Sequence, residues 1–114
     1  MLTNALIVLA ITAVGGLLLA AKILMGKQPP WFVSVVHALL GASGLVMLVM
    51  VALEGSASAR VTVALAILVV AAVGGFYLAS IHLKDKLAPK GVVIIHAGVA
   101  VAGFLTLASV VFDL

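Results

Sequence analysis

Four long runs without a charged residue alternate with short polar segments along the chain. The uncharged runs cover residues 1–21, 28–53, 61–83 and 91–112. A helix needs about 20 apolar residues to cross the hydrocarbon core of a bilayer. Each run therefore predicts one transmembrane helix, and together the four use nearly the whole chain. We expect helices at about 4–25, 31–53, 61–83 and 91–112.

The segments between the runs are short and rich in glycine, proline and polar residues. They cover residues 26–30, 54–58 and 84–90. Pro30 and Pro89 each predict a helix start, because the N–H that proline lacks is not needed at a helix entrance. Short connections make successive helices antiparallel. The pattern predicts an all-α membrane protein, a four-transmembrane-helix up-down bundle in a single membrane domain over residues 1–114.

Composition supports a membrane protein and removes several kinds of chemistry. The chain is 67% hydrophobic and 8% charged, which is more apolar surface than a soluble domain of 114 residues could bury. The first run lacks a basic start and a clear cleavage site, so we interpret it as a membrane span rather than a signal peptide. The chain has no cysteine, which excludes disulfides, thiolate metal sites and thiol catalysis.

The charged residues lie at the ends of the runs and predict an orientation. Five lysines belong to the first and third loops or their flanks: Lys22, Lys27, Lys84, Lys86 and Lys90. The opposite side carries only Arg60, Glu54 and Asp113. The positive-inside rule places the first and third loops in the cytoplasm and both termini outside, in a bacterial inner membrane. Trp31, at the start of the second helix, fits an interfacial anchor.

An internal repeat relates residues 1–55 to residues 60–114 without a gap, at an offset of 59. At this offset Val14-Gly15-Gly16 falls on Val73-Gly74-Gly75, Pro30 on Pro89, His37-Ala38 on His96-Ala97, and Gly44 on Gly103. Matches between common apolar residues arise often by chance, but the chain has only three histidines. The sequence therefore predicts a bundle built from two two-helix repeats, with two imidazoles at one depth.

His37 and His96 are the candidate metal ligands. His37 lies six residues past Trp31 and His96 six past Lys90, so both are about 9 Å inside their helix starts. Ionisable side chains inside a membrane are functional by default; the alternative is that each histidine donates to a neighbouring backbone carbonyl or hydroxyl. In a sequentially wound bundle the second and fourth helices are diagonal, roughly 11–14 Å apart. Both histidines can then reach one central iron but cannot easily bond to each other.

Small residues accompany the histidines on all four helices. The candidate cofactor-binding set contains Gly16, Gly41, Gly44, Gly75, Ala100 and Gly103. Such residues let transmembrane helices pack closely, and they also give the clearance that a flat macrocycle needs. Lys22 and His82 complete the set. His82 has Ile23 as its counterpart in the repeat; we interpret it as an interfacial histidine that contacts water or lipid headgroups, or alternatively as a partner for an anionic group.

The histidine segments Val-Val-His37-Ala-Leu-Leu-Gly41 and Ile-Ile-His96-Ala-Gly-Val-Ala100 lie within four short helices. This constellation resembles the small four-helix membrane b-type cytochromes of the cytochrome b561-like kind. The resemblance implies haem b bound by two histidines, electron transfer, and exchange with a quinone or a redox protein. That family typically holds two haems on four axial histidines, whereas the three histidines here support one haem at most.

Other functions share some of these features. A histidine with small neighbours can ligate the magnesium of a chlorophyll, and a structural subunit of a larger complex needs no chemistry of its own. Small multidrug exporters need a glutamate in the first helix, which is absent here. No hydrolytic or phosphate-binding motif occurs, so any catalysis would belong to a cofactor. The expected partners are the lipid bilayer, a quinone or redox protein, and a second copy of the chain; the basic residues lie at membrane edges and do not indicate nucleic acid.

Overall fold

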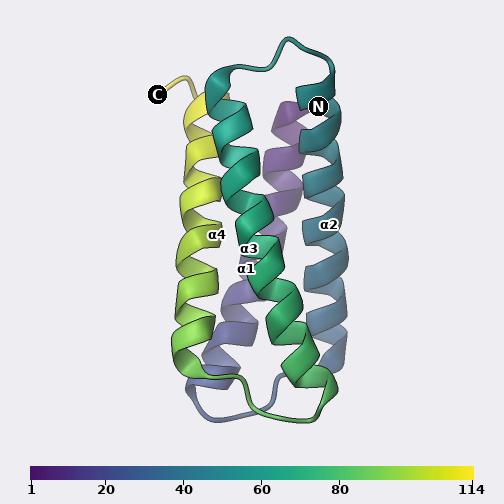
Figure 1. Cartoon of the computed structure of the whole chain (residues 1–114), viewed down its shortest axis with the longest axis vertical. Coiled ribbons are helices and arrows are strands. Elements are labelled where there is room, and N and C mark those ends of the chain that lie inside the picture. The colour runs from purple at the N-terminus through teal and green to yellow at the C-terminus, as the bar shows by residue number, and fades with distance from the viewer.

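The computed structural model describes residues 1–114 and contains four helices, α1 (Leu2–Leu24), α2 (Trp31–Leu53), α3 (Ala59–Leu83) and α4 (Lys90–Val111) (Figure 1). All four are long and apolar enough to cross a membrane. The predicted all-α fold with four membrane-spanning helices is therefore confirmed, and its construction from two repeats stays a prediction. The second helix has the expected bounds, and the other three differ from expectation only in their terminal residues.

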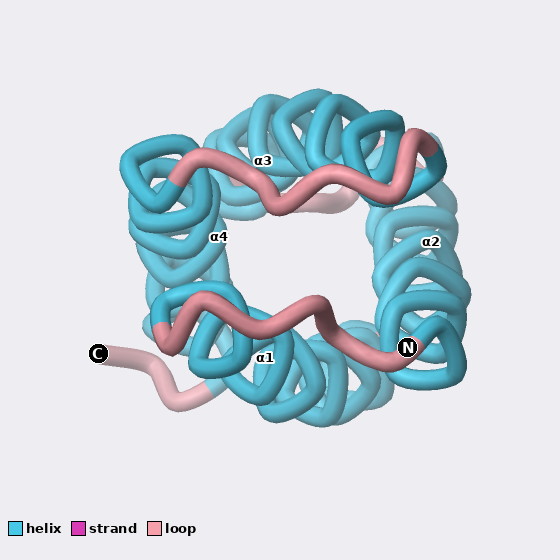
Figure 2. Tube along the Cα trace, turned by 90° about the horizontal axis from the view of Figure 1, so that it is seen from below, coloured by secondary structure: helices cyan, strands magenta, loops and turns pink.

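The helices form a four-cornered bundle in which helices consecutive in the chain pack on one another and α1 packs on α4. Figure 2 shows this arrangement from the end that carries the first and third loops. The backbones of the diagonal pairs, α1 with α3 and α2 with α4, do not approach each other closely. Contacts are most extensive within the two hairpins, α1–α2 and α3–α4, and sparsest between α2 and α3. The diagonal placement of α2 and α4 expected from the sequence is confirmed.

The two ends of the bundle differ in the segments they carry. The connections α1–α2 and α3–α4 lie at one end, and both termini lie at the other end with the α2–α3 connection (Figure 1). Gln28 Nε2 donates to the carbonyl of Lys86 at 3.2 Å and so links the first and third loops. The five lysines of the sequence pattern accordingly belong to one end of the molecule.

The helices α1 and α3 end in the same hydrogen-bond pattern. Lys27 N donates to the carbonyl of Lys22 at 2.9 Å, and Lys86 N donates to that of Ile81 at 3.2 Å. This six-to-one bond requires a left-handed residue just before the donor. Gly26 supplies it with a φ of 75°, and Asp85 with a φ of 55°. Both helices thus stop at matching positions, which fixes where the two basic loops begin.

Two apolar clusters lie toward opposite ends of the bundle, with the His37 and His96 levels between them. The larger consists of Ala5, Leu6, Leu9, Leu48, Ala64, Leu68 and Leu107. The smaller consists of Ile23, Ala88 and Val93. Many other large apolar side chains point outward, as lipid contact requires; Phe76 is 75% exposed.

Gly44 and Gly103 belong to the larger cluster and not to the surroundings of the histidines. A Cβ atom on Gly44 would lie 2.6 Å from Leu9 Cδ2, and one on Gly103 would lie 2.7 Å from Leu68 Cγ. Their role is close helix packing, the alternative that the sequence left open. Each of these two glycines faces a leucine of the adjacent helix rather than a histidine.

Candidate functional site

His37 projects from α2 onto the backbone of α1. Its Nδ1 lies 2.8 Å from the carbonyl oxygen of Thr12. A carbonyl only accepts hydrogen bonds, so Nδ1 carries the proton and donates. In the neutral ring the other nitrogen, Nε2, then has a free lone pair. The Thr12 carbonyl therefore fixes both the orientation and the tautomer of His37.

His96 makes the matching contact on the other hairpin. Its Nδ1 donates to the carbonyl oxygen of Ala71 on α3 at 2.8 Å. Both partners of this bond stand 59 residues after those of the first. Each hairpin thus presents one imidazole whose Nδ1 is bonded to a backbone carbonyl and whose Nε2 makes no hydrogen bond.

A glycine lies beside each accepting carbonyl, four residues further along the helix. A Cβ atom on Gly16 would lie 2.8 Å from His37 Cε1, and one on Gly75 would lie 3.2 Å from His96 Cε1. Helical Cβ atoms point back toward the N-terminus, so a side chain at these positions would cover the carbonyl that the histidine uses. The glycines therefore make room for the imidazole rings, which is a more specific role than the general clearance expected from the sequence.

The two imidazoles approach each other at the centre of the bundle. Their ring centres are 6.4 Å apart, and their planes cross at 81°. Every buried side-chain nitrogen and oxygen in the protein has a hydrogen-bond partner, whereas neither Nε2 has one. Neither Nε2 is therefore sealed among packed atoms. The pair leaves two nitrogen lone pairs available to a shared ligand.

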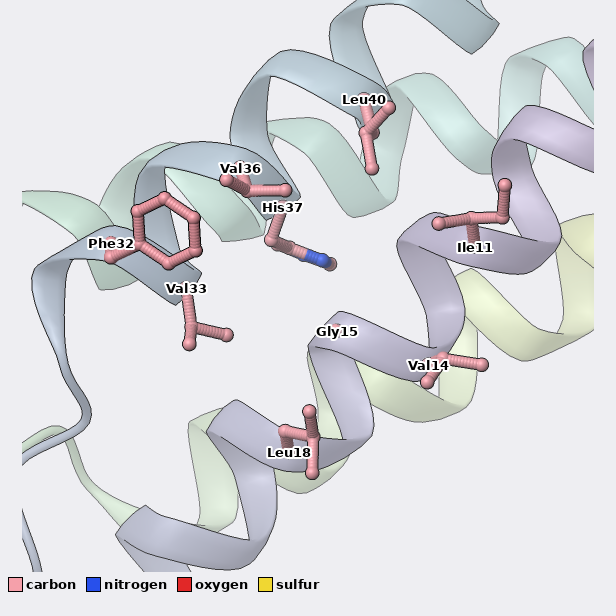
Figure 3. Close-up of a pocket in the computed structure, with 9 residues that line it drawn as sticks. All are labelled: Ile11, Val14, Gly15, Leu18, Phe32, Val33, Val36, His37 and Leu40. Carbon is pink, nitrogen blue, oxygen red and sulfur yellow. The ribbon is translucent and has the colours of Figure 1, made fainter.

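Figure 3 shows His37 together with an apolar groove of about 220 Å³ between α1 and α2. His37 is its only ionisable lining residue, among Ile11, Val14, Gly15, Leu18, Phe32, Val33, Val36 and Leu40. The imidazole points from α2 toward α1, where Gly15 leaves the backbone uncovered (Figure 3). Val14 and Phe32 are 62% and 78% exposed, so the groove opens on the outer surface of the bundle.

The remaining members of the predicted set lie in different surroundings. A Cβ atom on Gly41 would lie 3.4 Å from the Thr12 side chain, an ordinary packing distance. Ala100 is half-buried, and Lys22 is exposed in the last turn of α1. The structure thus brings Gly16 and Gly75 to the two histidines and leaves Lys22 on the surface.

His82, expected to contact water, lipid headgroups or an anionic group, is largely covered by neighbouring side chains. It is only 8% exposed. Its ring stacks on Trp31 with centres 3.7 Å apart and an angle of 7° between the planes. Its Nδ1 lies 3.2 Å from Ser34 Oγ. Trp31, interpreted from the sequence as an interfacial anchor, remains 42% exposed while it covers one face of His82.

The ionisable side chains set limits on what metal the protein could hold. No group of three or more histidine, cysteine, aspartate or glutamate side chains is placed to bind an ion. Structural and catalytic metal sites usually have at least three protein ligands. The His37–His96 pair would supply two protein ligands at most.

Comparison with protein-family models, with curated proteins and with solved structures finds no match for this chain. The functional argument therefore depends on the geometry of the site.

Proposed function

We propose that this protein is a membrane b-type cytochrome in which His37 and His96 bind one haem and which transfers electrons. The single observation that carries the proposal is the matched pair of imidazoles at the centre of the bundle, 6.4 Å apart. Each has its Nδ1 tied to a backbone carbonyl at 2.8 Å. Metal-binding histidines usually donate their second nitrogen in this way, which orients the ring and raises its basicity.

The separation of the two rings suits a shared metal. When two imidazoles bind one ion at about 2 Å per bond, their nitrogens are about 4 Å apart, and their ring centres are about 6 Å apart because each centre lies roughly 1 Å behind its nitrogen. Haem iron accepts axial histidine ligands on its two faces, and the macrocycle supplies the other four bonds. The donor set of this site therefore fits haem better than a bare ion.

The alternative role for these histidines is structural, as links between helices. The bonds to Thr12 and Ala71 do tie each hairpin together. A purely structural role uses only Nδ1 of each ring and gives no reason for the two Nε2 atoms to be left without a hydrogen bond. A shared metal satisfies both nitrogens at once, which favours the ligand role.

If both histidines bound the iron, the protein and the macrocycle together would fill its coordination positions. Bound haem would supply reversible one-electron chemistry, with no open position for oxygen. The chain's own residues would hold the group, set its ligand basicity through the Thr12 and Ala71 carbonyls, and exclude water with the two apolar clusters. The role this favours is electron transfer with a quinone or a redox protein.

The charge distribution supports an orientation within this proposal. The first and third loops carry the lysines and would face the cytoplasm, in agreement with the positive-inside rule. The anionic propionates of the haem would lie toward Lys22, Lys27 and Lys84, because these cations lie toward the same end of the molecule as His37 and His96.

The proposal is tested by titrating the purified protein, without bound cofactor, with haemin. We expect saturation at one haem per chain and a low-spin spectrum. Replacing His37 or His96 with alanine should abolish that spectrum, whereas His82→Ile should leave it intact. A pigment of the chlorophyll class bound in place of haem, or unchanged low-spin spectra in both alanine variants, would contradict the proposal.

A further inference from the structure

A second polar cluster, consisting of Trp31, Ser34 and His82, lies between α2 and α3 near the basic loops. His82 is 92% buried, being 8% exposed. Trp31 covers one face of its ring, and Ser34 Oγ bonds to its Nδ1. Its Nε2 makes no hydrogen bond. Every side-chain nitrogen or oxygen that is buried in this protein does make one. The small exposed part of His82 therefore includes Nε2, which is the free polar atom of the cluster.

The opposite side of the bundle shows that the fold does not need these polar residues. At the 59-residue offset His82 corresponds to Ile23, Ser34 to Val93 and Trp31 to Lys90. Ile23 and Val93 are buried together in the smaller apolar cluster, between α1 and α4. The same positions thus pack with apolar side chains in one place and with a polar, aromatic group in the other. Helix packing alone does not explain the histidine and the serine.

The serine hydroxyl allows His82 to adopt either neutral tautomer, whereas the hydrogen-bond partners of the other two histidines allow only one. A hydroxyl can both donate and accept a hydrogen bond, whereas a carbonyl only accepts. His37 and His96 are bonded to carbonyls and are therefore fixed as Nδ1–H tautomers when neutral. His82 can present Nε2 as an acceptor or, when the Ser34 hydroxyl turns round, as a donor. It suits a ligand that exists in both a donating and an accepting form.

We propose that Trp31, Ser34 and His82 bind the headgroup of a membrane quinone. A quinol hydroxyl would donate to Nε2, and a quinone carbonyl would accept from it, so one histidine serves both redox forms. Trp31 adds a flat apolar surface beside the contact, suited to an aromatic ring. Ser34 precedes the haem ligand His37 by three residues, about one helical turn. This inference rests on the proposed function, for which it names the exchange partner.

Trp31 is the only tryptophan of the chain, so its fluorescence reports on this cluster directly. The experiment uses the purified full chain without haem, titrated in detergent with a short-chain ubiquinone. The matched control is Ser34→Val/His82→Ile, which installs the residues that the opposite side of the bundle already packs. We expect saturable quenching in the wild-type protein and an affinity about tenfold weaker in the variant, as for one lost hydrogen bond.

A second variant and a second probe keep the test decisive. His82→Gln retains a donor and an acceptor and should recover part of the affinity. Equal quenching curves for the wild-type protein and Ser34→Val/His82→Ile would overturn the inference, because quinone would then merely partition into the detergent. A fluorescence change with anionic phospholipid but not with quinone would overturn it in favour of a phosphate headgroup.

The experiments can overturn the quinone proposal or the cytochrome proposal without overturning the other. Normal haem titration with no saturable quinone binding would overturn this inference alone. Saturable quinone binding that depends on His82, in a chain that never takes up haem, would support the quinone site and contradict the cytochrome proposal.

Discussion

The imidazole rings of His37 and His96 lie 6.4 Å apart with their planes nearly perpendicular. Each ring is held by a different hairpin, since His37 bonds to α1 and His96 bonds to α3. The direct packing between α2 and α3 is the sparsest in the bundle. A metal shared by the two rings would therefore join the two hairpins across the centre of the molecule.

The first prediction is that haem stabilises the bundle. A ligand that binds only the folded state adds stability of about 2.7 kcal/mol at a hundredfold excess over its Kd. Thermal unfolding followed by circular dichroism should shift to higher temperature when haem is added to the wild-type protein. The shift should vanish in His96→Ala, while His82→Ile should show it in full. An identical shift in His96→Ala would mean that haem binds elsewhere.

The second prediction concerns the glycines beside the imidazoles. Gly16→Ala places a Cβ atom 2.8 Å from His37 Cε1, so the ring must move. Overpacking costs about 1–3 kcal/mol, which corresponds to a roughly ten- to hundredfold loss of haem affinity if the ligand geometry absorbs it. Gly75→Ala, at 3.2 Å, should lose less. Haemin titrations of the purified variants measure whether Gly16→Ala loses more haem affinity than Gly75→Ala.

Gly15→Ala is the matched control for that series. Its Cβ atom would lie 3.8 Å from the nearest His37 atom, an ordinary contact. Haem affinity should therefore remain close to that of the wild-type protein. Equal losses in Gly15→Ala and Gly16→Ala would refute the specific role of Gly16.

The third prediction is that Gly44 contributes to the stability of the fold and not to haem binding. Gly44→Ala meets Leu9 at 2.6 Å and should destabilise the protein by about 1–3 kcal/mol without changing the haem spectrum. Adding Leu9→Ala should cancel part of the penalty caused by the new methyl group, because the clash is then gone. Gly98→Ala serves as the control, since its Cβ atom would meet nothing within 4 Å. Denaturant titration of the variants gives the free energies; a Gly44→Ala protein as stable as the wild type would exclude the packing role.

The fourth prediction is the orientation in the membrane. The chain has no cysteine, so single cysteines can be introduced without background. Ser56→Cys lies in the α2–α3 connection and Met25→Cys at the end of α1, and both positions are exposed. A membrane-impermeant maleimide should label Ser56→Cys in intact cells and Met25→Cys only after lysis. The reverse labelling would place the basic loops outside.

The helices were predictable from the sequence because charge is confined to their ends. Lys22, Glu54 and Lys84 interrupt the apolar runs close to the observed helix ends, and short loops leave a sequentially wound bundle as the simplest arrangement. The diagonal relation of α2 and α4 followed from that winding. The central positions of His37 and His96 were likewise predictable, since both stand at the same distance from a helix start.

The hydrogen-bond partners were not predictable in the same way. Which carbonyl of α1 accepts the hydrogen bond from His37 depends on the rotation of α1 and on its angle to α2. Every residue has a backbone carbonyl, so residue type does not show that the carbonyl is that of Thr12. The useful signal was the glycine four residues later, Gly16, because only its missing side chain uncovers that carbonyl. The same limit applies to Gly44, since the sequence does not show that it faces Leu9 rather than His37.

The burial of His82 was missed because its partners, Trp31 and Ser34, come from another helix. The alignment of the two halves of the sequence does set these three residues apart. His82, Ser34 and Trp31 depart from the repeat together, at the positions of Ile23, Val93 and Lys90. In the structure these three residues contact one another and form the cluster proposed to bind a quinone.

The central claim, that His37 and His96 are the two axial ligands of one haem, is tested most directly by electron paramagnetic resonance of the oxidised holoprotein. The angle of 81° between the imidazole planes predicts a strongly anisotropic low-spin signal with a single large g value, because nearly perpendicular axial planes leave two iron d orbitals almost equal in energy. That signal should disappear in His37→Ala and in His96→Ala. A high-spin signal, or the rhombic low-spin signal typical of parallel imidazole planes, would contradict the account.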